Sequence, residues 1–288
     1  MHRMWQTIQR KGLLCPRLLK LLKVCMPAAE LSRLQAQISA ISTQFETPAL
    51  FVKSLTALME LYSDRNYQTS DSIKIRVLMP SYRPPTLVIR QLEIDLSALT
   101  SQKPVPALEI MDLLWQKTFY ETQLLAIFML GNLPFDMLQP MSVRFLNWMK
   151  PGLENGLMEA LLNKGSLQLR QYKIDEWLRW AQKWIDNKNP EIVKIGLRAL
   201  LVVCADSNYI NFPTIFTSIE PLILKSFFPV QKDLTSLFKT IIERVPVEAI
   251  SFFRSILVQS QSKEIKSFFR RCLPFFEKDL QQSLKSNL

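Results

Sequence analysis

Helix-length apolar segments separated by short breaks recur along this chain, and they constrain its fold more than any other feature. After residue 85 the breaks fall every 12 to 20 residues, mostly at proline, glycine or asparagine. Proline is favoured at the start of a helix, because the N–H that it lacks would have no partner within the helix. The chain therefore reads as consecutive helices, several of them opened by Pro106, Pro190, Pro213, Pro229 and Pro246.

The segment 183–203, KWIDNKNPEIVKIGLRALLVV, shows the repeating unit most clearly. One helix ends near Ile185, a polar turn covers residues 186–189, and a second helix begins at Pro190. Lys194 and Arg198 lie four residues apart, away from the predicted core face of the second helix. The apolar residues spaced by three or four positions on that core face are Ile192, Ile195, Ala199 and Val202.

The same reading extends along the chain. Two helical segments are expected within residues 28–61, separated by residues 46–48. The later helices are expected at residues 86–99, 106–117, 119–131, 135–150, 152–162, 174–185, 190–204, 213–227, 229–245, 246–259 and 263–284, the last broken near Pro274. Antiparallel helix pairs without a strict consensus are typical of HEAT-like repeats. The predicted fold class is therefore an all-α, HEAT-like repeat α-solenoid with a concave face.

The predicted organisation has three parts. Residues 1–62 form an N-terminal helical cap with a basic first helix, residues 63–85 form a loop or linker with a short β-like run at 73–79, and residues 86–288 form the repeat domain. The basic first helix has two further interpretations, a transit peptide or a helix on a membrane surface. No run of apolar residues reaches the roughly 20 that are needed to span a bilayer, so we do not expect a membrane to be a partner.

The net charge of +11 is concentrated at the two ends of the chain. Residues 1–29 contain six cations and no acid, residues 225–288 contain eleven cations and six acids, and the residues between them are neutral. A basic surface binds polyanions by releasing their counterions. The last third of the chain is therefore the better candidate for a nucleic-acid groove.

Several kinds of chemistry lack the residues that they need. His2 is the only histidine, and no Gly-rich nucleotide-binding motif is present, so we expect no metal site and no cofactor. The cysteines form no CxxC pair, which favours a reducing compartment, and the predicted localisation is cytoplasmic. They stand at Cys15, Cys25, Cys204 and Cys272. An enzyme built from this chain would have to work with carboxylates, aromatic rings and cations.

Four stretches share the pattern of one family. They are the hairpin 183–203, the pair 112–133 (DLLWQKTFYETQLLAIFMLGNL), the pair 227–253 (FFPVQKDLTSLFKTIIERVPVEAISFF) and the basic helix 263–271. Together they resemble the AlkD-like DNA alkylation repair proteins, which are HEAT-like repeat DNA glycosylases that excise alkylated purines. The resemblance covers roughly residues 70–285 and implies duplex DNA, possibly alkylated, as the partner.

The resemblance also implies roles for individual residues. Lys194 would contact a phosphate near the lesion and Lys239 would be a second DNA-facing cation, while Arg198, one turn beyond Lys194, would share this work. The family's catalytic aspartate corresponds to Glu159. Two aromatic positions of the family hold Asn155 and Ser236 instead, so the implied protein binds DNA with its glycosylase pattern poorly retained, and enzymatic activity is uncertain.

Each of these assignments has a simpler alternative. Glu159 is also interpreted as a solvated helix residue, and the lysines as ordinary surface charges. Trp177, Trp180 and Trp184 form a stripe at helical spacing, which is either core packing or an aromatic platform for a base. For the whole chain, the alternative is a non-catalytic HEAT-like scaffold that binds a protein partner on its concave face.

Overall fold

The computed structural model describes residues 28–63, 79–225, 228–260 and 262–285, and these residues contain helices and no strand. The all-α prediction is thus confirmed for the described part of the chain. The predicted basic first helix lies outside the described residues, as does all but the last residue of the predicted β-like run at 73–79.

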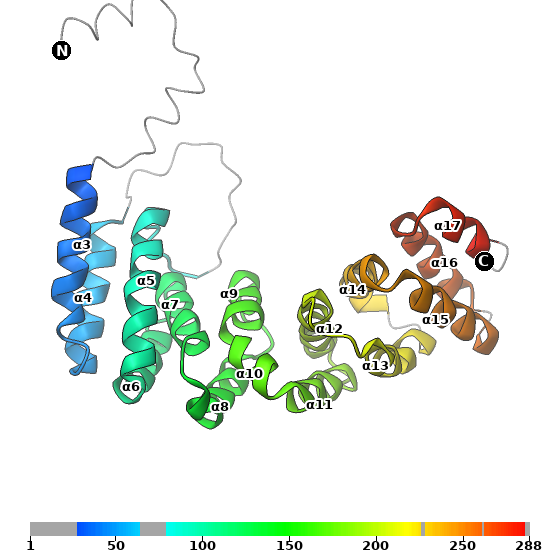
Figure 1. Ribbon diagram of the computed structural model, residues 1–288, viewed down its shortest axis with the longest axis horizontal. Helices are drawn as coiled ribbons and strands as arrows, with labels where there is room; N and C mark the ends of the chain where they lie inside the picture. Colours follow the sequence, from blue (N-terminus) through cyan, green and yellow to red (C-terminus); the bar gives the residue numbers. More distant parts are fainter. Residues whose placement is uncertain (1–27, 64–78, 226–227, 261, 286–288) are drawn as a thin grey trace, which may run out of the picture.

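The helices follow one another from end to end of an elongated molecule (Figure 1). Their bounds are α3 Ala28–Ser42, α4 Pro48–Leu61, α5 Thr86–Gln102, α6 Pro104–Gln116, α7 Tyr120–Gly131, η1 Phe135–Met137, α8 Leu138–Trp148, α9 Asn155–Ala160, η2 Leu161–Gly165, α10 Leu167–Tyr172, α11 Ile174–Ile185, α12 Pro190–Ala205, α13 Phe212–Leu224, η3 Phe228–Val230, α14 Gln231–Arg244, α15 Pro246–Gln259, α16 Lys263–Cys272, η4 Leu273–Phe275 and α17 Lys278–Lys285.

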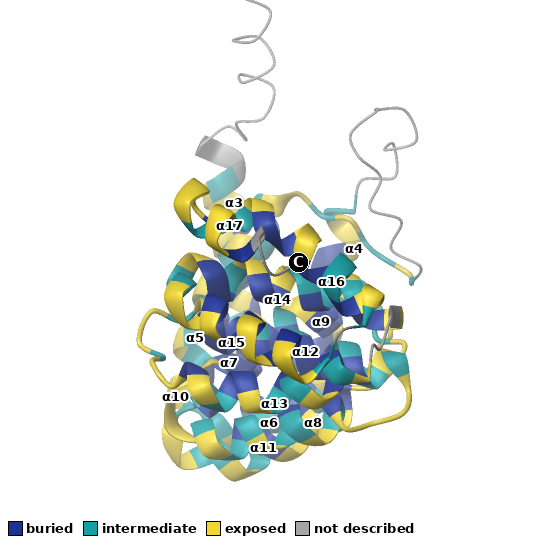
Figure 2. Cartoon of the chain, turned by 90° about the vertical axis from the view of Figure 1, so that its right-hand side faces the viewer, coloured by how far each residue is buried: buried dark blue, intermediate teal, exposed yellow. Residues whose placement is uncertain are grey.

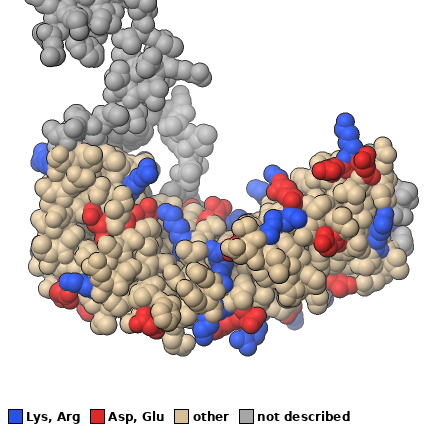
Figure 3. All heavy atoms as spheres, viewed as in Figure 1, with Lys and Arg blue, Asp and Glu red and all other residues tan. Residues whose placement is uncertain are grey.

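The helices form two rows, and each helix contacts mainly the next member of its own row and its partner in the other. We call the row of α3, α5, α7, α9 with η2, α12, α14 and α16 the inner row. The outer row contains α4, α6, α8, α10, α11, α13, α15 and α17. The molecule is bent, and a broad hollow opens on the side where α9, α12 and α14 lie (Figures 1 and 3).

Apolar burial between neighbouring helices holds the rows together. The buried residues form one continuous cluster that extends from Leu34 in α3 to Leu284 in α17. Viewed along the row, the buried residues lie on the sides of helices that face other helices, and the exposed residues lie outside (Figure 2). Each helix therefore depends on its neighbours, because a lone amphipathic helix leaves its apolar face in water.

Local sequence signals locate most helix starts correctly. Helices α11 and α15 have the predicted bounds, and proline occupies the first turn of α4, α6, α12, α13 and α15. The start of α6 is one correction, since Pro104 opens it two residues before the predicted Pro106. Another is Pro229, which lies in the short turn η3, so that α14 begins only at Gln231.

The largest departure from prediction is at residues 152–172. The sequence predicts a single helix at 152–162, but α9 begins at Asn155, because the Glu154 carboxylate accepts the N–H groups of Gly156 and Leu157 at 2.7 and 3.1 Å. The chain then forms the short π-helix η2 and the helix α10, which the sequence did not predict. A Cβ added to Gly131 would lie 2.1 Å from the carbonyl oxygen of Lys164, so α7 and η2 touch through their backbones.

One buried carboxylate joins the loop before α5 to α7. Glu121 is 5% exposed and accepts hydrogen bonds from the Ser81 hydroxyl and from the backbone N–H groups of Tyr82 and Arg83. The Tyr82 ring stacks on Phe119 with centroids 4.3 Å apart. The end of the predicted linker is therefore packed against the main body, while the proposed division into cap, linker and repeat domain stays a prediction.

Candidate nucleic-acid interface

The partly exposed stripe of α12 carries the two cations that the sequence indicated. The helix begins at a capped turn, in which the Asn189 side-chain oxygen accepts the Glu191 N–H at 3.0 Å. Lys194 and Arg198 lie one turn apart on the stripe, with 21% and 23% of their side chains exposed. The buried surface of α12 is wider than the single core face that the sequence predicts, because α11, α14 and η2 all pack on this helix. The further buried positions are Val193, Gly196, Leu197, Leu200, Val203 and Cys204.

Arg198 joins three consecutive helices of the inner row. Its Nε donates to the Asp233 carboxylate of α14 at 2.9 Å, and its Nη1 lies 3.4 Å from the side-chain oxygen of Asn155 in α9. The same Nη1 is 4.0 Å from a carboxylate oxygen of Glu159. The structure thus brings together Arg198 and the two α9 residues that the family resemblance aligned with a catalytic site.

The Glu159 side chain is exposed to solvent. Its side chain is 67% exposed, and the described contact of its carboxylate is the long ion pair with Arg198. Nearby, the close approach of Gly156 to Tyr120 packs α9 on α7, since an added Cβ would lie 2.7 Å from the Tyr120 hydroxyl. Burial, followed by the charges of Glu154, Glu121 and Glu159, raises the pKa of Tyr120, so this hydroxyl stays neutral.

The two lysines have local acidic neighbours. Lys194 lies 3.8 Å from Glu191, one turn earlier on α12, and Lys239 lies 3.9 Å from Glu243, one turn later on α14. Ion pairs at the surface of a protein contribute little to stability. The described contacts do not join Lys239 to the cluster around Arg198.

Sequence reasoning missed Asp233, which has only 16% of its side chain exposed and holds Arg198 in place. No local pattern identifies it, because the two residues are 35 positions apart in the sequence.

Reasoning from the sequence also singled out only one cation on α14, although the exposed face of that helix carries a second, Lys232. On α16, the basic helix expected from the sequence, Arg271 donates to the Gln231 side chain of α14 at 2.8 Å, which joins the two helices. Basic side chains, with acids among them, lie along the floor and right-hand wall of the hollow in Figure 3.

The tryptophan stripe of α11 packs in the core. Trp177 is fully buried, and its indole N–H donates to the Ala199 carbonyl oxygen of α12 at 3.2 Å. The centroid of the Phe145 ring in α8 lies 5.1, 6.0 and 6.4 Å from the rings of Trp177, Trp180 and Trp184. The core-packing interpretation is therefore confirmed for Trp177, and Trp180 and Trp184 are partly buried against the same core.

The described residues contain no metal cluster and no single helix that could cross a membrane. These residues contain no group of three or more His, Cys, Asp or Glu side chains placed to hold a metal ion. None of their helices is by itself long and apolar enough to cross a membrane, although α7 taken together with Phe135–Trp148 reaches the required length and composition across a bend of 112°.

Comparison with known proteins adds no relative to this description. The chain matches no family model, no curated protein and no solved structure.

Proposed function

We propose that the two rows form a HEAT-like α-solenoid whose hollow side is a concave binding face for duplex DNA, as the AlkD-like resemblance implies. The observation that supports this is the charge of the inner row. Helices α12, α14 and α16 carry nine Lys and Arg residues against four Asp and Glu residues. Helices α5, α7, α9 and η2 carry two against four. DNA would therefore bind the C-terminal half of the hollow.

Arg198 is suited to phosphate recognition at the centre of this face. Its guanidinium is held by Asp233 through Nε, which leaves the Nη side beside Asn155 and Glu159 at the surface. An arginine can present two parallel donors to a phosphate. Lys194 lies one turn earlier on the same stripe, and Lys239 adds a more exposed charge on α14.

A non-catalytic scaffold for a protein partner is the second candidate. It is favoured by the ion pairs that Lys194, Arg198 and Lys239 each make within the chain. It is also favoured by α7, whose partly exposed stripe of Tyr120, Leu124 and Phe128 is largely apolar. Such a surface suits a protein better than a phosphate backbone.

The two candidates differ in the salt dependence of DNA binding. We expect the purified chain to bind a 20-base-pair duplex with an affinity that falls by roughly 100-fold between about 50 and 200 mM salt, as for about four phosphate contacts. Replacing Lys232, Lys239 and Lys263 with glutamine should weaken binding and lower the slope by about 0.9 for each phosphate that is no longer neutralised. Fluorescence anisotropy measures both quantities.

A matched variant controls for net charge. Arg179, Lys183 and Lys188 are exposed on α11 of the outer row and the turn after it, and their triple glutamine variant loses the same charge. An equal effect of the two triple variants would contradict binding in the hollow. Absence of salt-dependent binding would favour the scaffold.

Base excision is tested separately, with DNA that contains 7-methylguanine or 3-methyladenine. We expect binding with little or no base release, because Glu159 is exposed and the aligned aromatic positions hold Asn155 and Ser236. Release that disappears in Glu159→Gln would instead establish a glycosylase. Gel separation of the strands after alkaline cleavage of abasic sites gives the measurement.

The proposal includes a reducing compartment such as the cytoplasm. It is supported by Cys204 and Cys272, which are free and buried thiols. Burial raises the pKa of each to about 12, with a smaller opposing effect from Arg244 and Arg271 respectively. Both thiols therefore remain protonated at neutral pH.

A further inference from the structure

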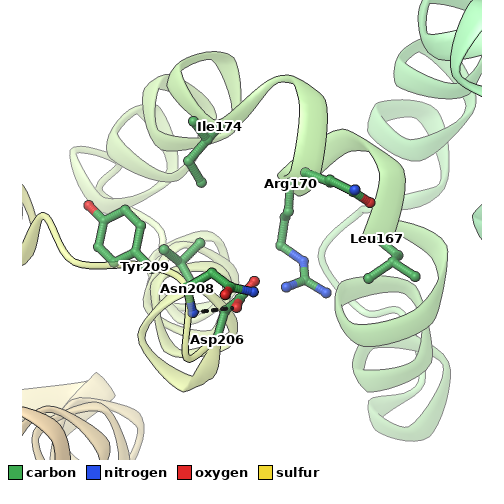
Figure 4. Close-up of a pocket in the computed structure, with 8 residues that line it drawn as sticks. Leu167, Arg170, Ile174, Asp206, Asn208 and Tyr209 are labelled. Atoms are coloured by element: carbon green, nitrogen blue, oxygen red, sulfur yellow. Dashed lines mark hydrogen bonds between the residues drawn. The ribbon is translucent and has the colours of Figure 1, made fainter.

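A pocket of about 440 Å³ lies between α10, the start of α11 and the loop after α12 (Figure 4). Its volume is in the range of small-molecule sites. Leu167, Ile174 and Val203 provide apolar walls, and Arg170 and Asp206 provide opposite charges. The pocket takes no part in the contacts around Arg198.

Arg170 is fixed in place with donors to spare. Its Nε donates to the Ser166 hydroxyl and its Nη2 to the Asn163 carbonyl oxygen, each at 3.0 Å. Burial lowers the pKa of Arg170, and the nearby Asp206 acts in the opposite direction. A guanidinium has five N–H donors, so three of them have no partner among the described residues. Such a group recognises a carboxylate in a bidentate manner.

Asp206, on the other side of the pocket, has a carboxylate that can accept further hydrogen bonds. One carboxylate oxygen accepts the Asn208 N–H at 3.0 Å, drawn as a dashed line in Figure 4. The structure shows no ion pair between this carboxylate and Arg170 within the described residues, although the guanidinium points toward it (Figure 4). The neighbouring Tyr209 hydroxyl donates to the Asn211 carbonyl oxygen at 2.8 Å and adds no charge, since burial, Cys204 and Asp175 raise its pKa to about 12.

We propose that this pocket binds a small zwitterion of the α-amino acid type, either a free amino acid or a dipeptide, with a branched apolar side chain. Its carboxylate would bind Arg170, its ammonium group would bind Asp206, and its side chain would cover Leu167, which is 50% exposed. A ligand that carries both charges would pair with the Arg170 guanidinium and the Asp206 carboxylate, which form no ion pair with each other. This site is independent of DNA binding.

Calorimetric titration of the full chain tests the proposal with four probes. They are L-leucine, L-leucyl-L-leucine, 4-methylpentanoate, which lacks the ammonium group, and 3-methylbutylamine, which lacks the carboxylate. We expect one zwitterion to bind with a 1:1 stoichiometry and each singly charged analogue to bind at least about tenfold more weakly, the effect of one charge-assisted hydrogen bond. If neither zwitterion binds, the proposal is wrong.

Asp206→Asn provides the second readout. Asparagine keeps the oxygen that accepts the Asn208 N–H but loses the charge, so the loop should be preserved. Affinity for the zwitterion should fall by about tenfold, and affinity for 4-methylpentanoate should change by less than about twofold. Asp186→Asn, at the end of α11 outside the pocket, is the matched control. Equal losses in the two variants, or no loss in Asp206→Asn, would overturn the assignment.

Discussion

Replacing Arg244 with methionine is expected to lower the free energy of unfolding by about 2–4 kcal/mol. The last carbonyl groups of a helix have no partners within it. Arg244 of α14 satisfies one of these groups in the last turn of α12 and three carbonyl groups of the chain that follows it, and its guanidinium also lies 5.3 Å from the centre of the Phe212 ring. Its Nη1 donates to the carbonyl oxygens of Cys204 and Asp206, both at 2.7 Å, and its Nη2 donates to those of Ser207 and Tyr209 at 3.2 and 3.0 Å.

Urea denaturation followed by circular dichroism measures this loss. Arg179→Met, on the exposed side of α11, removes a cation without these contacts and should change the stability by less than about 0.5 kcal/mol. Arg244→Lys should fall between the two, because it keeps the charge but not the planar set of donors. A similar stability for Arg244→Met and Arg179→Met would show that the four carbonyl groups are satisfied in another way.

Trp177→Ala is expected to lower the free energy of unfolding by about 3–5 kcal/mol, which is more than the loss expected for Arg244→Met. The side chain is fully buried between α8, α11 and α12, so its removal leaves a cavity and breaks the hydrogen bond from the indole N–H to the Ala199 carbonyl oxygen. Because neighbouring helices pack on each other, the loss should lower the midpoint of the whole unfolding transition if the helices unfold cooperatively.

Trp180→Ala is the matched control, since Trp180 lies on the same helix and contacts the same Phe145 ring but is only partly buried. Its loss should be clearly smaller. Trp177→Phe should recover part of the stability, because it restores ring packing without the hydrogen bond. Equal losses for the two alanine variants would contradict the central packing role of Trp177.

The helices that could be predicted are those whose ends have local causes. Pro190 and the Asn189 cap define the start of α12, and Pro246 defines the start of α15. Helix α10 has no such signal. It is short and follows the π-helix η2, and its position depends on bonds from Arg170 back to Ser166 and Asn163.

The candidate site was predicted only in part, for a related reason. Lys194 and Arg198 follow from the spacing within a single helix. The Arg198 contacts with Asp233, Asn155 and Glu159 join residues 35 to 43 positions apart, and they depend on how three helices stack. The described contacts do not test whether Lys239 faces DNA together with Lys194 and Arg198, so this stays a prediction.

The uneven charge of the inner row acts before any contact forms. At 0.1 M salt the field of exposed charges extends about 10 Å into the solvent. A long polyanion that approaches the hollow is attracted by the half containing α12, α14 and α16 and repelled by the more acidic half containing α5, α7, α9 and η2. The two forces act at opposite ends of an elongated body and together exert a torque. The described helices of the inner row therefore favour an approach in which the polyanion meets α12, α14 and α16 first, so that its position within the hollow is selected at the stage of encounter.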